Sequence, residues 1–166
     1  MTGITYRDAG VDLDAAGAKV CADPSQIHQI LMNLSSNAAD ALDGKVGVLE
    51  FRLHRCVAKT TTGARQPHLK LVIQDTGAGM DDQTVKRIFD PFYTTKEVGS
   101  GTGMGLAIVD SIVAAFGGMI KVKSAPGQGT AFEILIPLWT ENDEADSAIL
   151  DAVGRNGNAG TLTVQG

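Results

Sequence analysis

Three polar side chains of one predicted helix are spaced so that together they could bind a metal ion. Asn33, Asn37 and Asp40 lie four and three residues apart, which brings them to one side of a helix. An Asn carbonyl is a neutral, hard oxygen ligand that suits a Mg²⁺ ion already carrying phosphate oxygens. An ordinary solvated helix face explains the same pattern equally well, so this helix alone does not decide between the two.

A second candidate segment is Asp75-Thr76-Gly77-Ala78-Gly79-Met80, at the end of a predicted strand. A carboxylate at that place can accept a hydrogen bond from a purine amino group. Gly77 and Gly79 allow the backbone to approach a flat ring closely. A plain Asp/Gly turn, common at strand ends, is the alternative.

The third candidate is the glycine-rich run Gly99-Ser100-Gly101-Thr102-Gly103-Met104-Gly105, which leads into a predicted helix. Free backbone N–H groups and the helix dipole favour a phosphate there. The run is not a Walker loop, because no Lys-Ser/Thr pair follows its glycines, and it lacks the spacing of a dinucleotide fingerprint. A flexible loop is the alternative, but so many alternating glycines before a helix favour phosphate binding.

The segment Phe89 to Lys96 lies just upstream of those glycines. Its two Phe residues could anchor one end of a mobile flap, and Lys96 is placed to reach a phosphate. A Lys in a polar loop is usually only solvated, so this interpretation depends on its neighbours.

The elements that must position these residues are readable from periodicity. A helix starts at Asp23-Pro24 and carries an apolar stripe to Leu42. We also expect strands over 18–22, 46–57, 69–75, 119–124 and 130–138, a short helix over 81–88 and a helix over 105–116. This order predicts an α+β two-layer sandwich, in which a mixed, mostly antiparallel sheet has its helices on one face.

Composition excludes several classes. The chain has 166 residues and a net charge of -5, of which the acidic, Gly/Asn-containing segment 139–166 carries most. We therefore expect one domain over 1–138 and a linker-like tail over 139–166. The near-neutral body predicts no binding to nucleic acid, and no stretch is long and apolar enough to predict membrane contact. Two distant cysteines fit a reduced, cytoplasmic setting, including the cytosolic part of a membrane-anchored receptor.

Together the motifs resemble the ATP-binding catalytic domain of sensor histidine kinases, a member of the Bergerat-fold superfamily. Gln29 to Ala38 resembles the N box, Asp75 to Met80 the first glycine box and Phe89 to Lys96 the F box. Gly101 to Leu106 resembles the second glycine box, and Gly127 to Phe132 resembles the last one. These boxes occur in the right order over residues 18–138, which makes the joint match specific.

The resemblance implies ATP and Mg²⁺ as cofactors. It assigns Asn37 to Mg²⁺ and, with Lys96, to catalysis; Asn33 supports the phosphate side, and Asp75 binds the adenine amino group. The full set of nucleotide-binding residues that it implies is Asn33, Asn37, Asp40, Asp75, Gly77, Gly79, Met80, Lys96, Gly101, Thr102, Gly103, Met104, Gly105, Leu106 and Thr130.

The resemblance also implies a protein histidine kinase, because the hydrolytic relatives carry a water-activating Glu where this chain has Asn33. None of His28, His54 and His68 has the sequence context of a phosphoacceptor, and we expect the last two at the surface. The implied partners are a separate dimerisation and phosphoacceptor domain and a downstream response regulator. A true ATPase, a non-catalytic nucleotide-sensing module and a link to a receiver domain remain alternatives.

Overall fold

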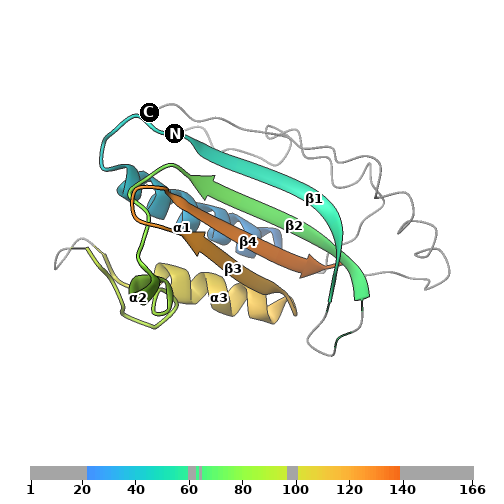
Figure 1. The fold of residues 1–166 in the computed structure, drawn as a ribbon. Coiled ribbons are helices and arrows are strands. Elements are labelled where there is room, and N and C mark those ends of the chain that lie inside the picture. The colour runs from blue at the N-terminus through green and yellow to red at the C-terminus, as the bar shows by residue number, and fades with distance from the viewer. Residues whose placement is uncertain (1–21, 60–62, 64, 97–100, 139–166) are drawn as a thin grey trace.

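The computed structural model describes residues 22–59, 63, 65–96 and 101–138. These residues form a four-stranded sheet with helices on one face, so the predicted α+β two-layer architecture is confirmed (Figure 1). The elements along the chain are α1 (Pro24–Leu42), β1 (Leu49–Lys59), β2 (Arg65–Asp75), α2 (Asp82–Val85), α3 (Gly105–Ala115), β3 (Met119–Ser124) and β4 (Thr130–Pro137).

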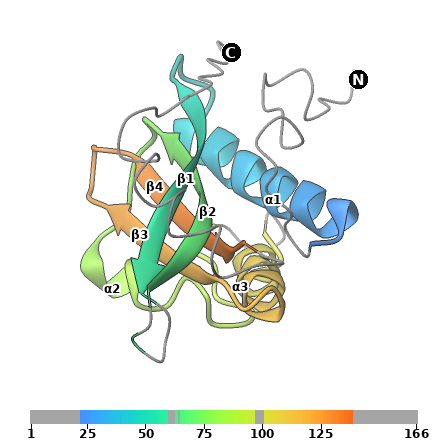
Figure 2. The same ribbon diagram turned by 90° about the vertical axis from the view of Figure 1, so that its right-hand side faces the viewer.

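The sheet has the strand order β1-β2-β4-β3, and every neighbouring pair is antiparallel. The mixed pairing expected from the sequence is therefore not seen among the described strands. Of the strand expected over 18–22, only residue 22 lies within the described part of the chain. Figure 2 shows α1 and α3 side by side on the same face of the sheet.

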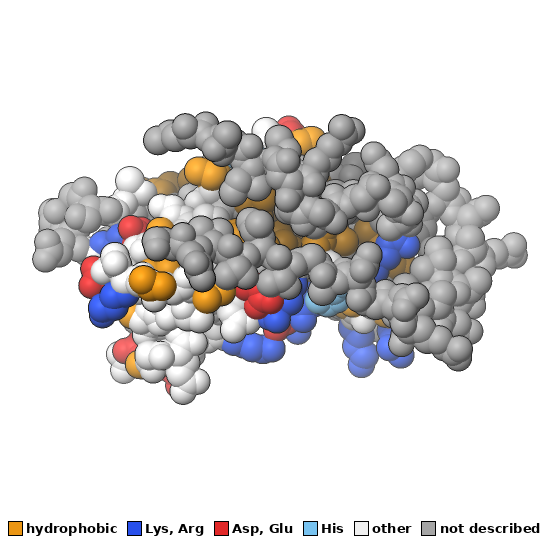
Figure 3. Space-filling model, turned by 90° about the horizontal axis from the view of Figure 1, so that it is seen from above, with side chains coloured by type: hydrophobic (Ala, Val, Ile, Leu, Met, Phe, Trp, Pro, Cys, Tyr) orange, Lys and Arg blue, Asp and Glu red, His pale blue; other side chains and the backbone are white. Residues whose placement is uncertain are grey.

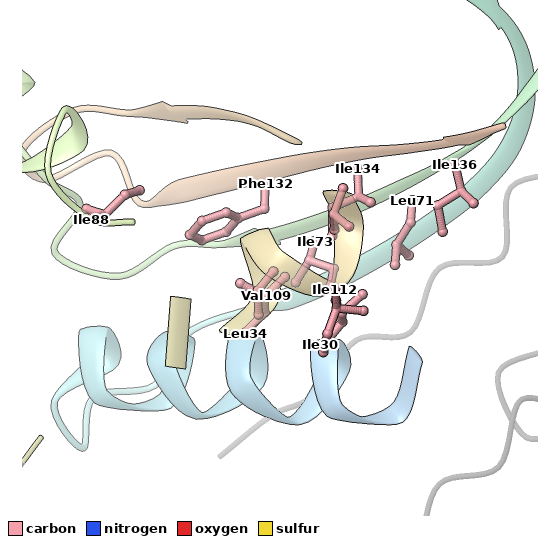
Figure 4. Close-up of a cluster of buried hydrophobic side chains, with 11 residues drawn as sticks. Ile30, Leu34, Leu71, Ile73, Ile88, Val109, Ile112, Phe132, Ile134 and Ile136 are labelled. Carbon is pink, nitrogen blue, oxygen red and sulfur yellow. The ribbon is translucent and has the colours of Figure 1, made fainter. Parts of the chain in front are cut away.

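The core fills the space between the sheet and the two long helices. Strand register aligns Ile73 with Phe132 and Leu71 with Ile134, so that alternate residues of β2 and β4 point toward the helices. Ile30, Leu34 and Val109 meet them from α1 and α3 (Figure 4). The apolar side of α1 is buried, and that burial, more than helix propensity, decides which side of α1 stays at the edge of the core.

The helix α1 begins and ends as its sequence predicts. Asp23 is extended, and its side chain accepts a hydrogen bond from the Ser25 amide, while Pro24 occupies the first helical position. At the other end, Asp43 adopts a left-handed conformation with φ of 50° and stops the helix.

Several boundaries differ from prediction. Residues 46–48 precede β1, whose pairing with β2 begins at Leu49 opposite Asp75. Val46 is 83% exposed, and a Cβ on Gly47 would lie 2.1 Å from Leu42 Cδ2. The short helix ends at Val85 instead of residue 88, because the Arg87 amide bonds to Thr84 O and the chain tightens into turns. The β1–β2 hairpin is tighter than expected, since β1 runs to Lys59 and β2 starts at Arg65.

The sheet face turned away from the helices carries many of the charged side chains of the strands. Register places Lys70, Glu133 and Lys123 on that face, with Glu133 between the two lysines. In the view from above, basic and acidic side chains lie next to one another near the centre of the lower edge (Figure 3). No helix of the described residues is long and apolar enough to cross a membrane.

Candidate functional site: a buried carboxylate, a helix of amides and a glycine-rich segment

Asp75 is a buried carboxylate at the end of β2, with 5% of its surface exposed. Its Oδ1 accepts hydrogen bonds from the Gly77 amide at 2.8 Å and from the Thr130 amide at 3.3 Å. Because both bonds go to one oxygen, Oδ2 retains its capacity to accept a hydrogen bond from a ligand. Burial raises the pKa of Asp75, and the two backbone amides act against that rise.

The turn after Asp75 is packed without spare room. The amide of Ala78 donates to Ala41 O at the end of α1, and a Cβ on Gly77 would lie 2.7 Å from the Ala41 Cβ. Gly79 has a φ of +67°, and a Cβ there would lie 2.0 Å from Ala125 O. These two glycines are therefore required by close packing against Ala41 and Ala125, while their predicted approach to a flat ring stays a prediction.

Ser124, at the end of β3, ties this turn to β4. Its Oγ accepts from the Met80 amide at 2.8 Å, donates to Gly129 O at 2.9 Å and lies 3.0 Å from the Thr130 hydroxyl. Sequence reasoning missed Ser124, because its partner Met80 lies 44 residues away. The structure thus brings Asp75, Gly77, Gly79, Met80 and Thr130 together, as expected.

The amide residues of α1 form a second group at the rim. The Asn33 side-chain amide donates to Gln29 O at 2.9 Å. This bond leaves Asn33 Oδ1 facing the start of α3, where a Cβ on Gly105 would lie 3.0 Å from it. Asn37 is half-buried one turn further on, and its side chain makes no hydrogen bond to the described residues.

The third group is the glycine-rich segment, of which the structure describes residues 101–105. The Phe92 amide donates to Gly103 O, and a Cβ on Gly103 would lie 2.4 Å from the Phe92 carbonyl carbon. Phe92 itself is 76% exposed, so its backbone, not its ring, holds this segment. Gly99 and Ser100 lie outside the described residues.

Lys96 lies beside this segment and forms an ion pair with Asp40 of α1. A Cβ on Gly101 would lie 3.0 Å from both Lys96 Cδ and Thr94 Oγ1. The ion pair and the Asn33–Gly105 contact place the predicted phosphate-side residues along one edge of α1. Thr94 is a further member of this group that sequence reasoning did not single out.

Two predicted nucleotide-binding residues also have packing roles. Leu106 packs partly against the core. Met104 lines a depression of about 350 Å³ beside α3, together with Pro91, Ile108 and Gln26 of α1. Thr102 accepts a hydrogen bond from the Met104 amide at 3.3 Å, which shapes the last turn before the helix.

The histidines differ from expectation in one case. His68 was expected at the surface but is buried, with 2% of its surface exposed and Nδ1 2.8 Å from Gln66 O. Its strand lies between β1 and β4, so its flanking hairpin position does not expose it. Burial, with help from Lys70 and Arg52, lowers the pKa of His54 on the edge strand.

The sequence and the fold both match known proteins. The family model "Histidine kinase-, DNA gyrase B-, and HSP90-like ATPase" matches residues 22–140. The sensor kinase CckA of Brucella abortus is 37% identical over 134 residues, which cover 78% of this chain and 14% of CckA. This chain spans about a quarter or less of the length of the curated relatives that it matches.

Two solved structures extend the comparison. The mycobacterial sensor histidine kinase MprB is 30% identical with a TM-score of 0.54, over 73% of this chain and 76% of that chain. Full-length ShkA in complex with AMPPNP is 32% identical with a TM-score of 0.51, over 69% of this chain and 22% of that chain. These findings confirm the predicted resemblance. The chain belongs to the family of histidine kinase-, DNA gyrase B- and HSP90-like ATPases, as an ATP-binding catalytic domain of the sensor histidine kinase type.

Proposed function

We propose that this domain binds Mg-ATP and transfers the γ-phosphoryl group to a histidine on a separate dimerisation and phosphoacceptor domain, in two-component signalling. The observation that carries the proposal is the buried Asp75, whose Oδ1 is held by two backbone amides while Oδ2 remains an acceptor. The AMPPNP complex of the similar ShkA supports the choice of an adenine nucleotide.

In this proposal Asp75 accepts a hydrogen bond from the adenine amino group. Gly79 lets the backbone pass close to the ring, and Met80 and Thr130 complete the pocket, with Ser124 holding both in place. A buried carboxylate that binds an amino group rejects a base that presents a carbonyl there, because two acceptors would then face each other without a proton.

The described residues fit a Mg²⁺ ion that takes few ligands from the protein and most of its ligands from water and phosphate. They contain no group of three or more His, Cys, Asp or Glu side chains that could hold a metal. Mg²⁺ is commonly bound through one or two protein oxygens together with waters and substrate phosphates, and Asn37 offers such an oxygen. When bound, the ion would neutralise charge on the phosphates.

Transfer to a protein, and not to water, is supported by Asn33. An amide cannot act as a general base, and this one is already bonded to Gln29 O. The rival function, a true ATPase, predicts substantial phosphate release by the isolated domain. A non-catalytic nucleotide-sensing module predicts nucleotide binding without transfer.

The phosphoacceptor would come from outside this chain. His68 is buried and His54 lies on β1, while His28 is exposed on α1 but lacks the sequence context of a phosphoacceptor. We accordingly propose a response regulator as the downstream partner and the cytoplasm as the compartment. The domain boundary at residue 138 and the tail over 139–166 remain predictions, because residues 139–166 lie outside the described part of the chain.

The test is a transfer assay with radiolabelled ATP, Mg²⁺ and the helical acceptor domain of the same full-length kinase. Wild-type domain should label the acceptor, and Asn37→Ala should abolish labelling, since the proposed Mg²⁺ ligand is gone. Ser36→Ala, at an exposed neighbouring position of α1, is the control and should keep full activity. Unchanged transfer by Asn37→Ala would refute the assignment of this residue.

A further inference from the structure

Asp40 and Lys96 form an ion pair that joins two separate parts of the site. Lys96 Nζ donates to Asp40 Oδ2, across 56 residues of sequence. The Lys96 side chain is 33% exposed and that of Asp40 is 50% exposed, so dissolved ions and ligands can reach the pair.

The position of Lys96 is also restricted from its other side. Its Cδ lies 3.0 Å from the place of a Cβ on Gly101, and its backbone amide donates to Thr94 Oγ1 at 3.1 Å. Among the residues that the structure describes, Asp40 is the one carboxylate paired with this ammonium group, which lies between α1 and the glycine-rich segment. Asp40 lies three residues after Asn37, on the same side of α1.

We propose that Asp40 is the counter-ion that Lys96 gives up when a polyphosphate binds, so that Asp40 sets how strongly the site distinguishes nucleotides by phosphate number. This inference rests on the proposed function and changes the predicted role of Asp40. Instead of contacting the nucleotide, Asp40 acts through Lys96 as a positioning residue.

Two effects of Asp40 oppose polyphosphate binding. Lys96 must first leave its carboxylate, although a half-exposed pair of this kind holds it only weakly. The carboxylate that is left behind then repels the incoming phosphates across a short distance. Neither effect acts on adenosine, which has no phosphate. Asp40 therefore weakens ADP and ATP binding while leaving recognition of the base untouched.

The experiment measures the affinities of adenosine, ADP and AMPPNP by calorimetry without Mg²⁺, which isolates the interaction of phosphate with Lys96. Asp40→Asn should tighten ADP and AMPPNP by roughly three- to ten-fold and leave adenosine unchanged. Asp40→Ser, which removes the carboxylate with a shorter side chain, should do the same. Asp43→Asn is the matched control, because it neutralises an exposed carboxylate three residues further on that forms no ion pair with the described residues.

A double-mutant cycle identifies Lys96 as the partner. Lys96→Gln should weaken ADP and AMPPNP, and in that background Asp40→Asn should tighten them less than it does in wild type, because only the direct repulsion between Asp40 and the phosphates is left to remove. The inference is overturned if Asp40→Asn fails to tighten ADP, shifts adenosine equally, or keeps its full gain in Lys96→Gln. If wild-type protein binds none of the three ligands, the proposed function itself fails, which is a different result.

Discussion

The carboxyl group of Asp75 is subject to two opposing effects. Burial raises its pKa, because the charged form loses its water, while hydrogen bonds from the Gly77 and Thr130 amides favour the charged form. A ligand amino group would add a third donor and would therefore favour the carboxylate further. Recognition of a ligand at this site therefore depends on the Asp75 carboxyl group being ionised, so that it accepts a hydrogen bond.

We expect Asp75→Asn to weaken the binding of AMPPNP by roughly 10- to 100-fold, since a hydrogen bond to a charged acceptor is lost and an amide NH₂ can face the adenine amino group. Calorimetry with Mg²⁺ measures this loss. Asp110→Asn, at an exposed carboxylate of α3, is the control and should bind like wild type. Wild-type affinity in Asp75→Asn would remove Asp75 from the adenine pocket.

Sequence alone predicted some residues of the site better than others. Asp75, Gly77 and Gly79 form one continuous motif, so their close association follows from the chain itself. Ser124 is a single polar residue at a strand end, and nothing local in its sequence signals a bond to Met80. His68 was wrongly expected at the surface, since the burial of a strand residue depends on which strands flank it and not on its distance from a hairpin.

At the scale of elements, the turn between β3 and β4 closes the site. Gly127 and Gly129 both adopt left-handed backbone, with φ of +75° and +74°. They differ in their surroundings. A Cβ on Gly129 would lie 2.0 Å from Asp75 O, while a Cβ on Gly127 would meet nothing within 4 Å. Gly127 is thus required by its backbone conformation alone, and Gly129 is required by its conformation and by its close contact with Asp75.

This pair makes a matched test of crowding. Gly127→Ala should cost about 1 kcal/mol of unfolding free energy, from the strain of a left-handed alanine. Gly129→Ala should cost about 3 kcal/mol or more and weaken nucleotide binding, because the strand end that carries Asp75 must shift. Urea unfolding followed by circular dichroism measures both variants. Equal costs would show that the contact with Asp75 O is easily relieved.

Element types were predictable wherever local signals were strong. The Asp23-Pro24 start of α1 and the alternation in β1 and β2 are properties of short windows of sequence. The early end of α2 was not predictable, since the bond from the Arg87 amide to Thr84 O competes closely with a further helical turn. The ends of β1 and β2 at their hairpin extend further than predicted, because the two strands pair there. The residue pattern of one strand alone does not indicate such pairing.

At the scale of the whole molecule, the sheet is held by apolar packing on one face and by ion pairs on the other. Glu133 of β4 bonds to Lys70 of β2 at 2.8 Å and to Lys123 of β3 at 2.6 Å, so it links three strands. These lysines lower the pKa of Glu133 to about 2, from an ordinary value of 4.5. The folded state therefore favours the ionised form of Glu133.

This shift predicts a pH-dependent contribution to stability. Because the pKa in the folded state is the lower one, the contribution is complete above pH 4.5 and is lost as the pH falls toward 2. Glu133→Gln should lower the free energy of unfolding by about 1–2 kcal/mol at pH 7, an estimate reduced for the solvent exposure of Lys123. The difference from wild type should shrink through that acidic range.

Urea unfolding at several pH values between 2 and 7 provides the measurement. The control is again Asp110→Asn, which removes an exposed carboxylate that forms no ion pair with the described residues. If Glu133→Gln and wild type have the same free energy of unfolding at every pH, the ion pairs that link the three strands add nothing to stability.

The close contact between Ala41 and the turn at Gly77 also bears on how the domain tolerates changes of length. The Ala78 amide is bonded to Ala41 O, so extra residues between β2 and this bond would unseat the end of α1. Gly63 lies in the β1–β2 hairpin with open space around it and a φ of +85°. A peptide tag or reporter loop belongs at that hairpin, at the opposite end of β2 from Asp75, because the same insertion in the turn after Asp75 would disrupt the site.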